Sequence, residues 1–176
     1  MQIGIGTVGP VGNLGAAAPT CGTGHSMILS AQAVPSAAML PCLAALPSGW
    51  SIGGADIASG KVRLWLDSDR AGTHAITVTF TATCDTSGTH QIPSDQPRMR
   101  RFEHVTSLTP QFTGLRIYTF PGGCATYRFS FAPGASPVLA DAAGSALSFQ
   151  PRPVLVDFIQ RSEGLALCGR GAACPG

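Results

Sequence analysis

Apolar and polar residues alternate with a period of two in two segments near the middle of the chain. The first segment covers residues 61–66, and its apolar positions are Val62, Leu64 and Leu66. The second covers residues 74–84, where apolar residues alternate with the threonines Thr77, Thr79, Thr81 and Thr83. Such alternation, with β-branched residues, is typical of half-buried strands. Because residues 67–72 form a polar turn sequence, the pattern predicts an antiparallel hairpin.

The same alternation recurs on both sides of a glycine pair. Residues 115–120 and 124–131 both alternate, and the sequence Pro-Gly-Gly lies between them. Glycine adopts the positive φ angles that tight hairpin turns need. This is the strongest hairpin signal in the chain, and we expect the two predicted hairpins to share one antiparallel sheet.

The segments around these hairpins carry weaker patterns. Residues 25–33 are compatible with an extended piece or a short helix, and residues 35–46 with one or two helical turns that begin near Ser36. The glycines at positions 49, 53, 54 and 60 predict irregular structure before the first hairpin. Residues 85–114 form a long polar connection, in which residues 100–108 are expected to be a short strand or a helical turn.

Near the C-terminus the pattern becomes helical. Ser136 is a suitable N-cap with a proline at the first helical position, and apolar residues follow near helical spacing up to Leu147. A second short helix is expected over residues 154–161 and a final strand over residues 165–168. These elements predict an α+β fold, in which an antiparallel sheet of two β-hairpins packs against one or two short C-terminal helices. An all-β sandwich is the alternative.

Length and composition are those of one folded domain with a short extension. The chain has 176 residues, of which 44% are hydrophobic and 11% charged. A chain with this balance can bury a substantial core and lacks the high charge typical of disorder. Residues 1–20 are rich in glycine, alanine and proline, so we expect a flexible linker or stem there. Residues 21–176 are predicted to form a single disulfide-stabilised domain.

Charge and hydropathy argue against two classes of protein. The net charge is +2, whereas nucleic-acid-binding domains usually concentrate many basic residues on one face. The sequence contains no apolar run long enough for a membrane-spanning helix, so no such segment is expected in it. Attachment to a membrane would then require a signal peptide or an anchor that precedes Met1.

Six cysteines indicate the compartment in which the protein works. They are Cys21, Cys42, Cys84, Cys124, Cys168 and Cys174, and none belongs to a Cys-x-x-Cys pair. This usage favours disulfide bonds in an oxidising, extracytoplasmic compartment over a zinc site or free cytosolic thiols. Among the possible pairings we predict the sequential one, which is Cys21–Cys42, Cys84–Cys124 and Cys168–Cys174. The second of these bonds would tie the two hairpins together.

One cluster of basic residues is a candidate ligand site. Arg98, Arg100 and Arg101 lie close to His104 in the sequence. Arginine binds phosphate, sulfate and carboxylate groups through bidentate hydrogen bonds. We therefore take these four residues as candidates for binding an anionic ligand, with a solvated loop as the alternative.

Other motifs are incomplete. Asp67 and Asp69 begin a sequence like a calcium loop, but two of the expected ligands are missing, so a hairpin turn is expected instead. The four histidines are dispersed, without metal-binding spacing. Aromatic residues on alternating strands more often pack in a core than line a carbohydrate groove; those concerned are Trp50, Trp65, Tyr118 and Tyr127. No catalytic residue, metal site or cofactor is predicted.

Three segments together resemble a known group of proteins. They are LSAQAVPS at residues 29–36 with the following Pro41-Cys42, LDSDRAG at residues 66–72, and FPGGCATYRF at residues 120–129. They resemble extracytoplasmic portions of uncharacterised secreted or membrane-anchored proteins of high-GC Gram-positive bacteria. The resemblance covers roughly residues 21–168. It implies a location at the cell envelope and no known activity.

These observations favour a non-enzymatic extracytoplasmic domain that acts as a binding or interaction module of the cell envelope. Its partner is expected to be a protein, a glycan or an anionic ligand, and not a nucleic acid. The alternative is a secreted hydrolase whose site is assembled only in the fold. A deep pocket that joins a histidine to a carboxylate and a serine hydroxyl would favour that alternative. A purely structural cap or stalk domain is the third possibility.

Overall fold

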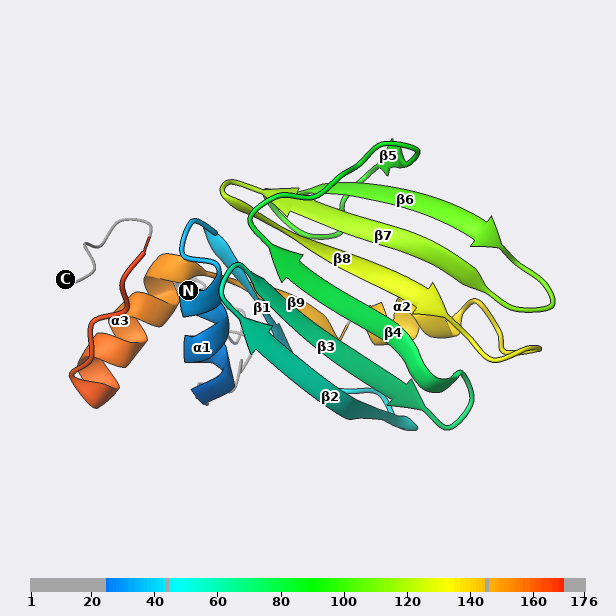
Figure 1. Ribbon diagram of the computed structural model, residues 1–176, viewed down its shortest axis with the longest axis horizontal. Coiled ribbons are helices and arrows are strands. Elements are labelled where there is room, and N and C mark those ends of the chain that lie inside the picture. Colours follow the sequence, from blue (N-terminus) through cyan, green and yellow to red (C-terminus); the bar gives the residue numbers. More distant parts are fainter. Residues whose placement is uncertain (1–24, 44, 145, 170–176) are drawn as a thin grey trace, which may run out of the picture.

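The fold is dominated by antiparallel β-structure. A computed structural model describes residues 25–43, 45–144 and 146–169 of the chain. These residues form a seven-stranded sheet, a two-stranded sheet and three short helices (Figure 1). Figure 1 views the large sheet from its open face, and the small sheet lies behind it.

The elements follow one another along the chain with short connections. The strands of the large sheet are β2 (Trp50–Ala58), β3 (Lys61–Ser68), β4 (Gly72–Thr81), β5 (His90–Ile92), β6 (Arg100–Ser107), β7 (Thr113–Phe120) and β8 (Gly123–Ser130). The small sheet consists of β1 (Met39–Leu43) and β9 (Leu147–Pro151). The helices are α1 (His25–Ala33), α2 (Leu139–Gly144) and α3 (Arg152–Glu163).

Both predicted hairpins belong to the large sheet. β3 pairs with β4 and β7 pairs with β8, in each case antiparallel. The two hairpins lie side by side because β4 also pairs with β8. The full strand order is β2-β3-β4-β8-β7-β6-β5. The prediction of two hairpins therefore described only the middle of the sheet, which β2 extends on one side and β6 and β5 extend on the other.

Two segments before the first hairpin differ from their predictions. Residues 49–60 were expected to be irregular, but most of them form β2, where a bulge between Ile52 and Gly54 accommodates the glycine pair. Residues 35–46 were expected to hold helical turns, but β1 forms there and includes Pro41. Proline is tolerated because β1 pairs only with β9 and so keeps one edge free of ladder hydrogen bonds. For residues 25–33 the helical alternative is the one observed.

The C-terminal helices are present with other bounds than predicted. The first is the six-residue α2, and residues 147–151 leave the helical pattern to form β9. α3 ends before Gly164, which has the left-handed φ of 64° that favours glycine at this position. The prediction of a final strand was wrong, since residues 165–168 form none.

One face of the large sheet, called here the inner face, packs against the rest of the molecule. Its buried side chains on β4, β7 and β8 are Ile76, Val78, Phe80, Tyr118, Phe120, Ala125, Tyr127 and Phe129. The ring of Phe149 on β9 lies 5.6 Å from the rings of both Tyr118 and Phe120. The small sheet therefore covers the inner face, and Leu155 and Ile159 of α3 extend the same core.

A buried arginine joins the helical end of the molecule to this core. Arg152 is only 2% exposed, and its Nε donates a hydrogen bond to the Ala37 carbonyl at 2.7 Å. Its Nη2 donates to the carbonyls of Ala31 at 2.6 Å and Val34 at 2.7 Å. These carbonyls belong to the last turn of α1 and to the residues after it, where a positive charge is favourable.

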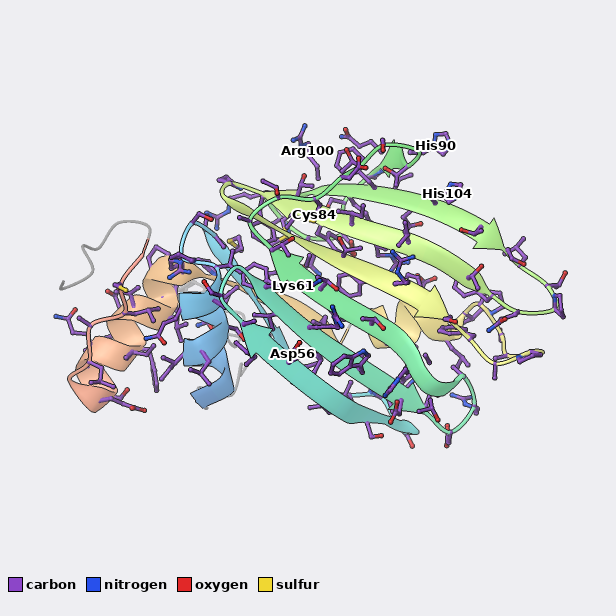
Figure 2. The ribbon with its side chains drawn as sticks, viewed as in Figure 1. Asp56, Lys61, Cys84, His90, Arg100 and His104 are labelled. Atoms are coloured by element: carbon purple, nitrogen blue, oxygen red, sulfur yellow. A yellow bond between two sulfur atoms is a disulfide. The ribbon has the colours of Figure 1, made fainter. Side chains whose placement is uncertain are left out.

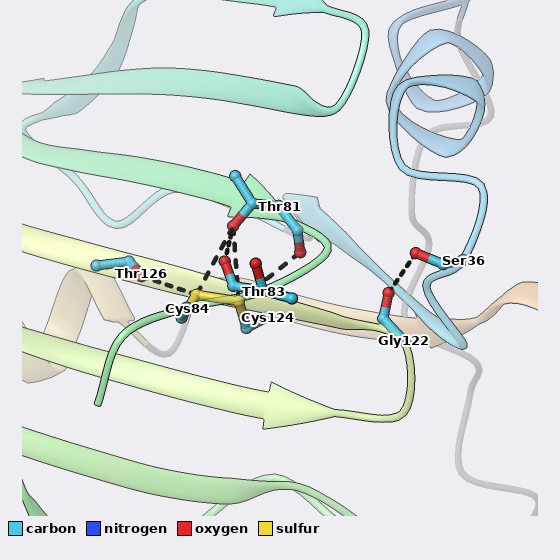
Figure 3. Close-up of a disulfide and its surroundings, with 7 residues drawn as sticks. All are labelled: Ser36, Thr81, Thr83, Cys84, Gly122, Cys124 and Thr126. Carbon is cyan, nitrogen blue, oxygen red and sulfur yellow. Dashed lines mark hydrogen bonds between the residues drawn. A yellow bond between two sulfur atoms is a disulfide. The ribbon is translucent and has the colours of Figure 1, made fainter. Parts of the chain in front are cut away.

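The predicted disulfide bond between Cys84 and Cys124 is present, with a Cα–Cα distance of 6.1 Å (Figure 3). It ties the chain that follows β4 to the start of β8, and the hydroxyl of Thr126 lies 3.3 Å from the Cys84 sulfur. Cys42 and Cys168 are disulfide-bonded as well. The predicted pairings Cys21–Cys42 and Cys168–Cys174, like the predicted stem at residues 1–20, involve positions outside the described residues.

Candidate functional site on the open face of the sheet

The second face of the large sheet, called here the outer face, has no helix or strand packed over it within the described part of the chain (Figure 1). Side chains alternate between the two faces of a strand, so strand register and burial identify those that point outward. They include Lys61, Arg63, Trp65, Thr77, Thr79, Arg100, Phe102, His104, Leu115, Thr126 and Arg128. The chain after β4 crosses one end of this face, where Cys84 is bonded to the outward-facing Cys124, and Cys124 and Ile117 are each only 2% exposed.

The predicted basic cluster is divided between the two faces. Because residues 100–107 form strand β6, Arg100 and His104 point outward and are exposed (Figure 2). Arg101 lies between them in the sequence and points to the inner face. Arg98 is exposed in the loop before β6, with a φ of 63°. The structure thus brings together Arg100 and His104 but not the whole predicted set.

Arg101 takes part in an ion-pair network on the inner face. It donates to Glu103 Oε1 from Nε at 2.9 Å and from Nη2 at 2.5 Å, and to Asp95 Oδ1 from Nη1 at 3.2 Å. Arg116, which is 7% exposed, donates from Nε to the same Glu103 oxygen and from Nη2 to Asp141 Oδ1 at 2.7 Å. Each of these two guanidinium groups therefore already has two carboxylate partners, which leaves it little capacity for an anionic ligand.

Both tyrosines of the chain lie beside this network. The Tyr118 hydroxyl donates to Asp95 Oδ1 at 2.8 Å. Burial, followed by this hydrogen bond, raises the pKa of Tyr118 far above its ordinary value. Burial would raise the pKa of Asp95, but hydrogen bonds and the charge of Arg101 outweigh it and lower that pKa. Tyr127 is fully buried, its hydroxyl has no hydrogen-bond partner among the described residues, and burial raises its pKa well above the ordinary value.

The aromatic residues considered for a carbohydrate groove are mostly core residues. Trp50, Tyr118 and Tyr127 are 8%, 2% and 0% exposed, so they pack inside as the more common arrangement predicts. Trp65 alone among the four lies on the outer face. A shared groove of these residues therefore does not exist.

A small cavity lies next to the ion-pair network, beneath β6 and β7. Its volume is about 30 Å³, and its lining includes Val105, Phe112, Gly114, Arg116 and Phe129. One water molecule needs about 10 to 15 Å³ by the same measure, so the cavity has room for about two or three. The cavity is therefore too small to receive a substrate or a cofactor.

The histidines and acidic residues form no catalytic or metal-binding arrangement in the described part of the chain. His74, His90 and His104 are exposed, and none of their side chains hydrogen-bonds a carboxylate there. No group of three or more metal-ligating side chains occurs among the described residues. Asp67 Oδ1 instead accepts a hydrogen bond from the backbone N–H of His74 at 2.6 Å, and Ser68 Oγ accepts one from a later turn residue. These are the contacts of a hairpin turn.

Four cations of the outer face have no ion-pair partner. They are Lys61, Arg63, Arg100 and Arg128, and none lies within 4.0 Å of a carboxylate oxygen among the described residues. The nearest acidic position in the strand register is Asp56, which lies opposite Arg63 on the edge strand β2. The cations of the outer face are thus solvated without a carboxylate partner, whereas the two arginines of the inner-face network are paired with carboxylates.

The strand register sets the spacing of these cations. Arg63 and Arg128 are on β3 and β8, which are separated by β4. Since neighbouring strands lie about 4.8 Å apart, this separation is about 10 Å across the sheet. Lys61 and Arg100 occupy the two ends of one cross-strand row that runs from β3 to β6, about 19 Å by the same estimate. The four cations therefore cover an area much wider than a single phosphate or carboxylate group.

Trp65 lies within this area and rests on the neighbouring strand. A Cβ atom at Gly54 would approach its Cε3 and Cζ3 atoms to 3.2 and 3.6 Å, so the indole lies against the glycine backbone. The guanidinium carbon of Arg63 and the ring of His74 each lie 5.8 Å from the centre of the indole. A second contact of this kind joins Arg100 to Phe102 at 5.8 Å. Such contacts keep the cations extended over the sheet.

The sequence contained a signal for part of this site. Lys61, Arg63 and Trp65 alternate with the apolar residues of a predicted strand, which places them together on the polar side. Arg128 occupies the equivalent position on the second predicted hairpin. The missing information was the pairing of β4 with β8, which brings the two polar sides onto one face.

Two further observations bear on identity and location. No helix of the described residues is long and apolar enough to cross a membrane. Comparison of the chain with protein-family models, with curated proteins and with solved structures finds no match. The candidate site is therefore defined by the geometry and charge of the outer face.

Proposed function

We propose that this protein is a non-enzymatic, extracytoplasmic binding module that holds an anionic polymer of the cell envelope on its outer face. The observation that supports this proposal most strongly is the set of unpaired cations on that face. Lys61, Arg63, Arg100 and Arg128 share it without a carboxylate partner among the described residues. A ligand of opposite charge is attracted to such a surface and is oriented by it.

The spacing of the cations favours a polymer over a small anion. One phosphate or carboxylate group can form bidentate hydrogen bonds with one or two arginines. Cations that are about 10 to 19 Å apart across the strands can act together only on a ligand with repeated charges. Several weak contacts along one chain then add up to useful affinity.

Cysteine chemistry supports the location. All cysteines among the described residues are in disulfide bonds, which persist in oxidising compartments outside the cytosol. A binding role requires no catalytic group, in line with the absence of a complete catalytic motif from the sequence.

Direct binding measurements test the proposal. Immobilised heparin, polygalacturonate and inorganic polyphosphate serve as polyanions, and dextran serves as the neutral control. We expect binding to at least one polyanion, no binding to dextran, and an affinity that falls as salt is added. Each of Lys61→Gln, Arg100→Gln and Arg128→Gln should weaken binding about threefold to tenfold, which is about 0.7 to 1.4 kcal/mol.

Arg161→Gln is the matched control, since this exposed arginine lies on α3, away from the large sheet. It should bind like the wild type. The proposal fails if no polyanion binds, or if the three outer-face substitutions weaken binding no more than the α3 control does.

A further inference from the structure

We infer that the ligand of the outer face is an acidic polysaccharide with carboxylate groups, and that one of its sugar rings stacks on Trp65, with Arg63 on the same strand and Arg128 two strands away. This inference rests on the proposed function and adds to it a defined subsite and a ligand class. Three features of the outer face carry it: an aromatic surface, a row of hydroxyl groups and two guanidinium groups. Each of them matches a different part of an acidic sugar.

The aromatic surface is that of the indole of Trp65. One side of the indole lies against the backbone at Gly54, where a Cβ atom would come within 3.2 Å of it. Trp65 is only partly buried and points to the outer face, where the Arg63 guanidinium and the His74 ring lie 5.8 Å from its centre and border its exposed part. The C–H face of a sugar ring is apolar and its rim is polar, so it binds well to a flat aromatic surface with polar neighbours.

Threonine hydroxyls supply the polar neighbours. Thr77 lies directly opposite Trp65 in the register of β3 and β4, and Thr79 lies opposite Arg63. Thr126 continues the row of Thr79 onto β8. The hydroxyls of Thr77 and Thr79 form no hydrogen bond with other described residues, and a threonine hydroxyl both donates and accepts. They can therefore both donate hydrogen bonds to sugar hydroxyls and accept hydrogen bonds from them. The ionised oxygens of a polyphosphate can only accept.

Two arginines lie at opposite corners of this group of outward-facing residues. Arg63 is on the same strand as Trp65, and Arg128 faces Thr77 from β8. A planar guanidinium group matches a carboxylate in bidentate geometry, and three of the four outer-face cations are arginine. A polymer of uronic acids combines carboxylates, hydroxyls and apolar ring faces in every repeat, as this arrangement requires.

The experiment compares two polyanions on the same variants. Polygalacturonate has sugar rings and carboxylates, and inorganic polyphosphate has charge alone. We expect Trp65→Ala to weaken binding of polygalacturonate at least tenfold and to change binding of polyphosphate less than twofold. Trp65→Phe keeps an aromatic surface and should retain most of the affinity. In Gly54→Ala the added Cβ atom would lie 3.2 Å from Trp65 Cε3, so the indole must shift by only a few tenths of an ångström and binding of polygalacturonate should weaken less than in Trp65→Ala.

Tryptophan fluorescence gives an independent readout. The chain has two tryptophans, and Trp50 is 8% exposed in the core. Polygalacturonate should therefore change the emission of the wild type and not that of Trp65→Phe. Thermal unfolding of each variant shows whether the fold is retained. Arg161→Gln again provides the reference for a substitution outside the site.

The outcomes separate this inference from the proposed function. If Arg128→Gln weakens both polymers while Trp65→Ala weakens neither or weakens both equally, the sugar subsite is wrong and the anion-binding face stands. Tighter binding of a single-stranded oligonucleotide than of polygalacturonate would likewise overturn the choice of a polysaccharide. If no outer-face substitution changes binding of either polymer, both proposals fail.

Discussion

Arg100 and Arg101 are neighbours in the sequence and lie in opposite electrostatic environments. Arg101 points to the inner face, where Glu103 and Asp95 accept its hydrogen bonds. Arg100 points to the outer face and has no carboxylate partner among the described residues. The same contrast distinguishes Arg116 on β7 from Arg128 on β8. The alternation of side chains along a strand thus determines which arginines form ion pairs inside the protein and which remain free to bind a ligand.

The arginines of the inner face need carboxylate partners because burying an unpaired charge is energetically costly. A charged group inside a protein needs partners, because desolvation costs several kcal/mol. The inner face meets this need with a network that joins β6, β7 and α2. On the outer face water solvates the cations, so the fold itself requires no partner for them. A charge that the fold does not need is a better candidate for a role in binding.

The largest effect that tests this contrast is expected from Arg116→Met. It leaves Glu103 with Arg101 as its remaining partner, and Asp141 is 74% exposed, so we expect a loss of about 3 kcal/mol, at the lower end of the range of about 3 to 5 kcal/mol for breaking a buried pair. Arg128→Met on the outer face should change the free energy of unfolding by less than about 0.5 kcal/mol. Urea unfolding of both variants measures the difference. Equal losses would show that the two faces do not differ in the way described.

The next largest loss of stability is expected from removal of the Cys84–Cys124 disulfide bond, which fixes the chain after β4. Replacement of both Cys84 and Cys124 by serine removes a loop closure over a sequence separation of 40 residues. We expect a loss of about 2 to 4 kcal/mol in the free energy of unfolding, since the unfolded chain gains conformational freedom. Chemical denaturation under non-reducing conditions measures it. A variant as stable as the wild type would mean that the remaining contacts of β4 and β8 already fix this region.

A third test uses the pH dependence of stability, which reports the difference in tyrosine pKa between the folded and the unfolded protein. Tyr118 and Tyr127 are the only tyrosines, and the pKa of both is raised in the folded protein. Below pH about 10 both are neutral in the folded and unfolded states, so they cause no pH dependence there. Above that value the unfolded chain loses protons that the folded chain keeps, and stability falls as pH rises.

Near-ultraviolet absorbance of tyrosinate measures this behaviour. We expect no tyrosinate in the folded protein at pH values where both tyrosines ionise in concentrated denaturant, and a single cooperative rise when the fold is lost. In Tyr118→Phe the rise should have half the amplitude. If Tyr118 or Tyr127 ionised near the ordinary pKa of tyrosine while the circular dichroism remained that of the folded protein, the burial of the inner face would be contradicted.

The sequence was sufficient for the parts of the fold in which neighbouring residues carry the signal. Both hairpins follow from alternation over consecutive residues, and the Cys84–Cys124 bond follows from their ends. β6 was left open between a strand and a helical turn because its inner positions are occupied by Arg101 and Glu103. These charged residues remove the apolar alternation that would have identified a strand. Their partner, Arg116, becomes a neighbour only when β6 and β7 pair.

Only part of the candidate site could be predicted from the sequence, for a related reason. A cluster that includes Arg98, Arg100 and Arg101 looks continuous along the chain, but a strand directs alternate members to opposite faces. The other lysine and arginine residues that share a face with Arg100 come from other strands, namely Lys61, Arg63 and Arg128. Their proximity depends on strand order, which local patterns do not encode.

The smallest expected effects on stability belong to the outer-face cations themselves. Lys61→Gln should change the free energy of unfolding by less than about 0.5 kcal/mol, because Lys61 has no ion pair to lose. Arg63→Gln and Arg100→Gln should cost slightly more, about 0.5 to 1 kcal/mol, since their guanidinium carbons lie 5.8 Å from the rings of Trp65 and Phe102. Denaturant titrations of the three variants in parallel resolve this order. Losses above about 2 kcal/mol would mean that these cations are needed by the fold, and the contrast between the two faces would no longer support a binding role. Small losses combined with weakened polyanion binding would locate their contribution in the ligand complex.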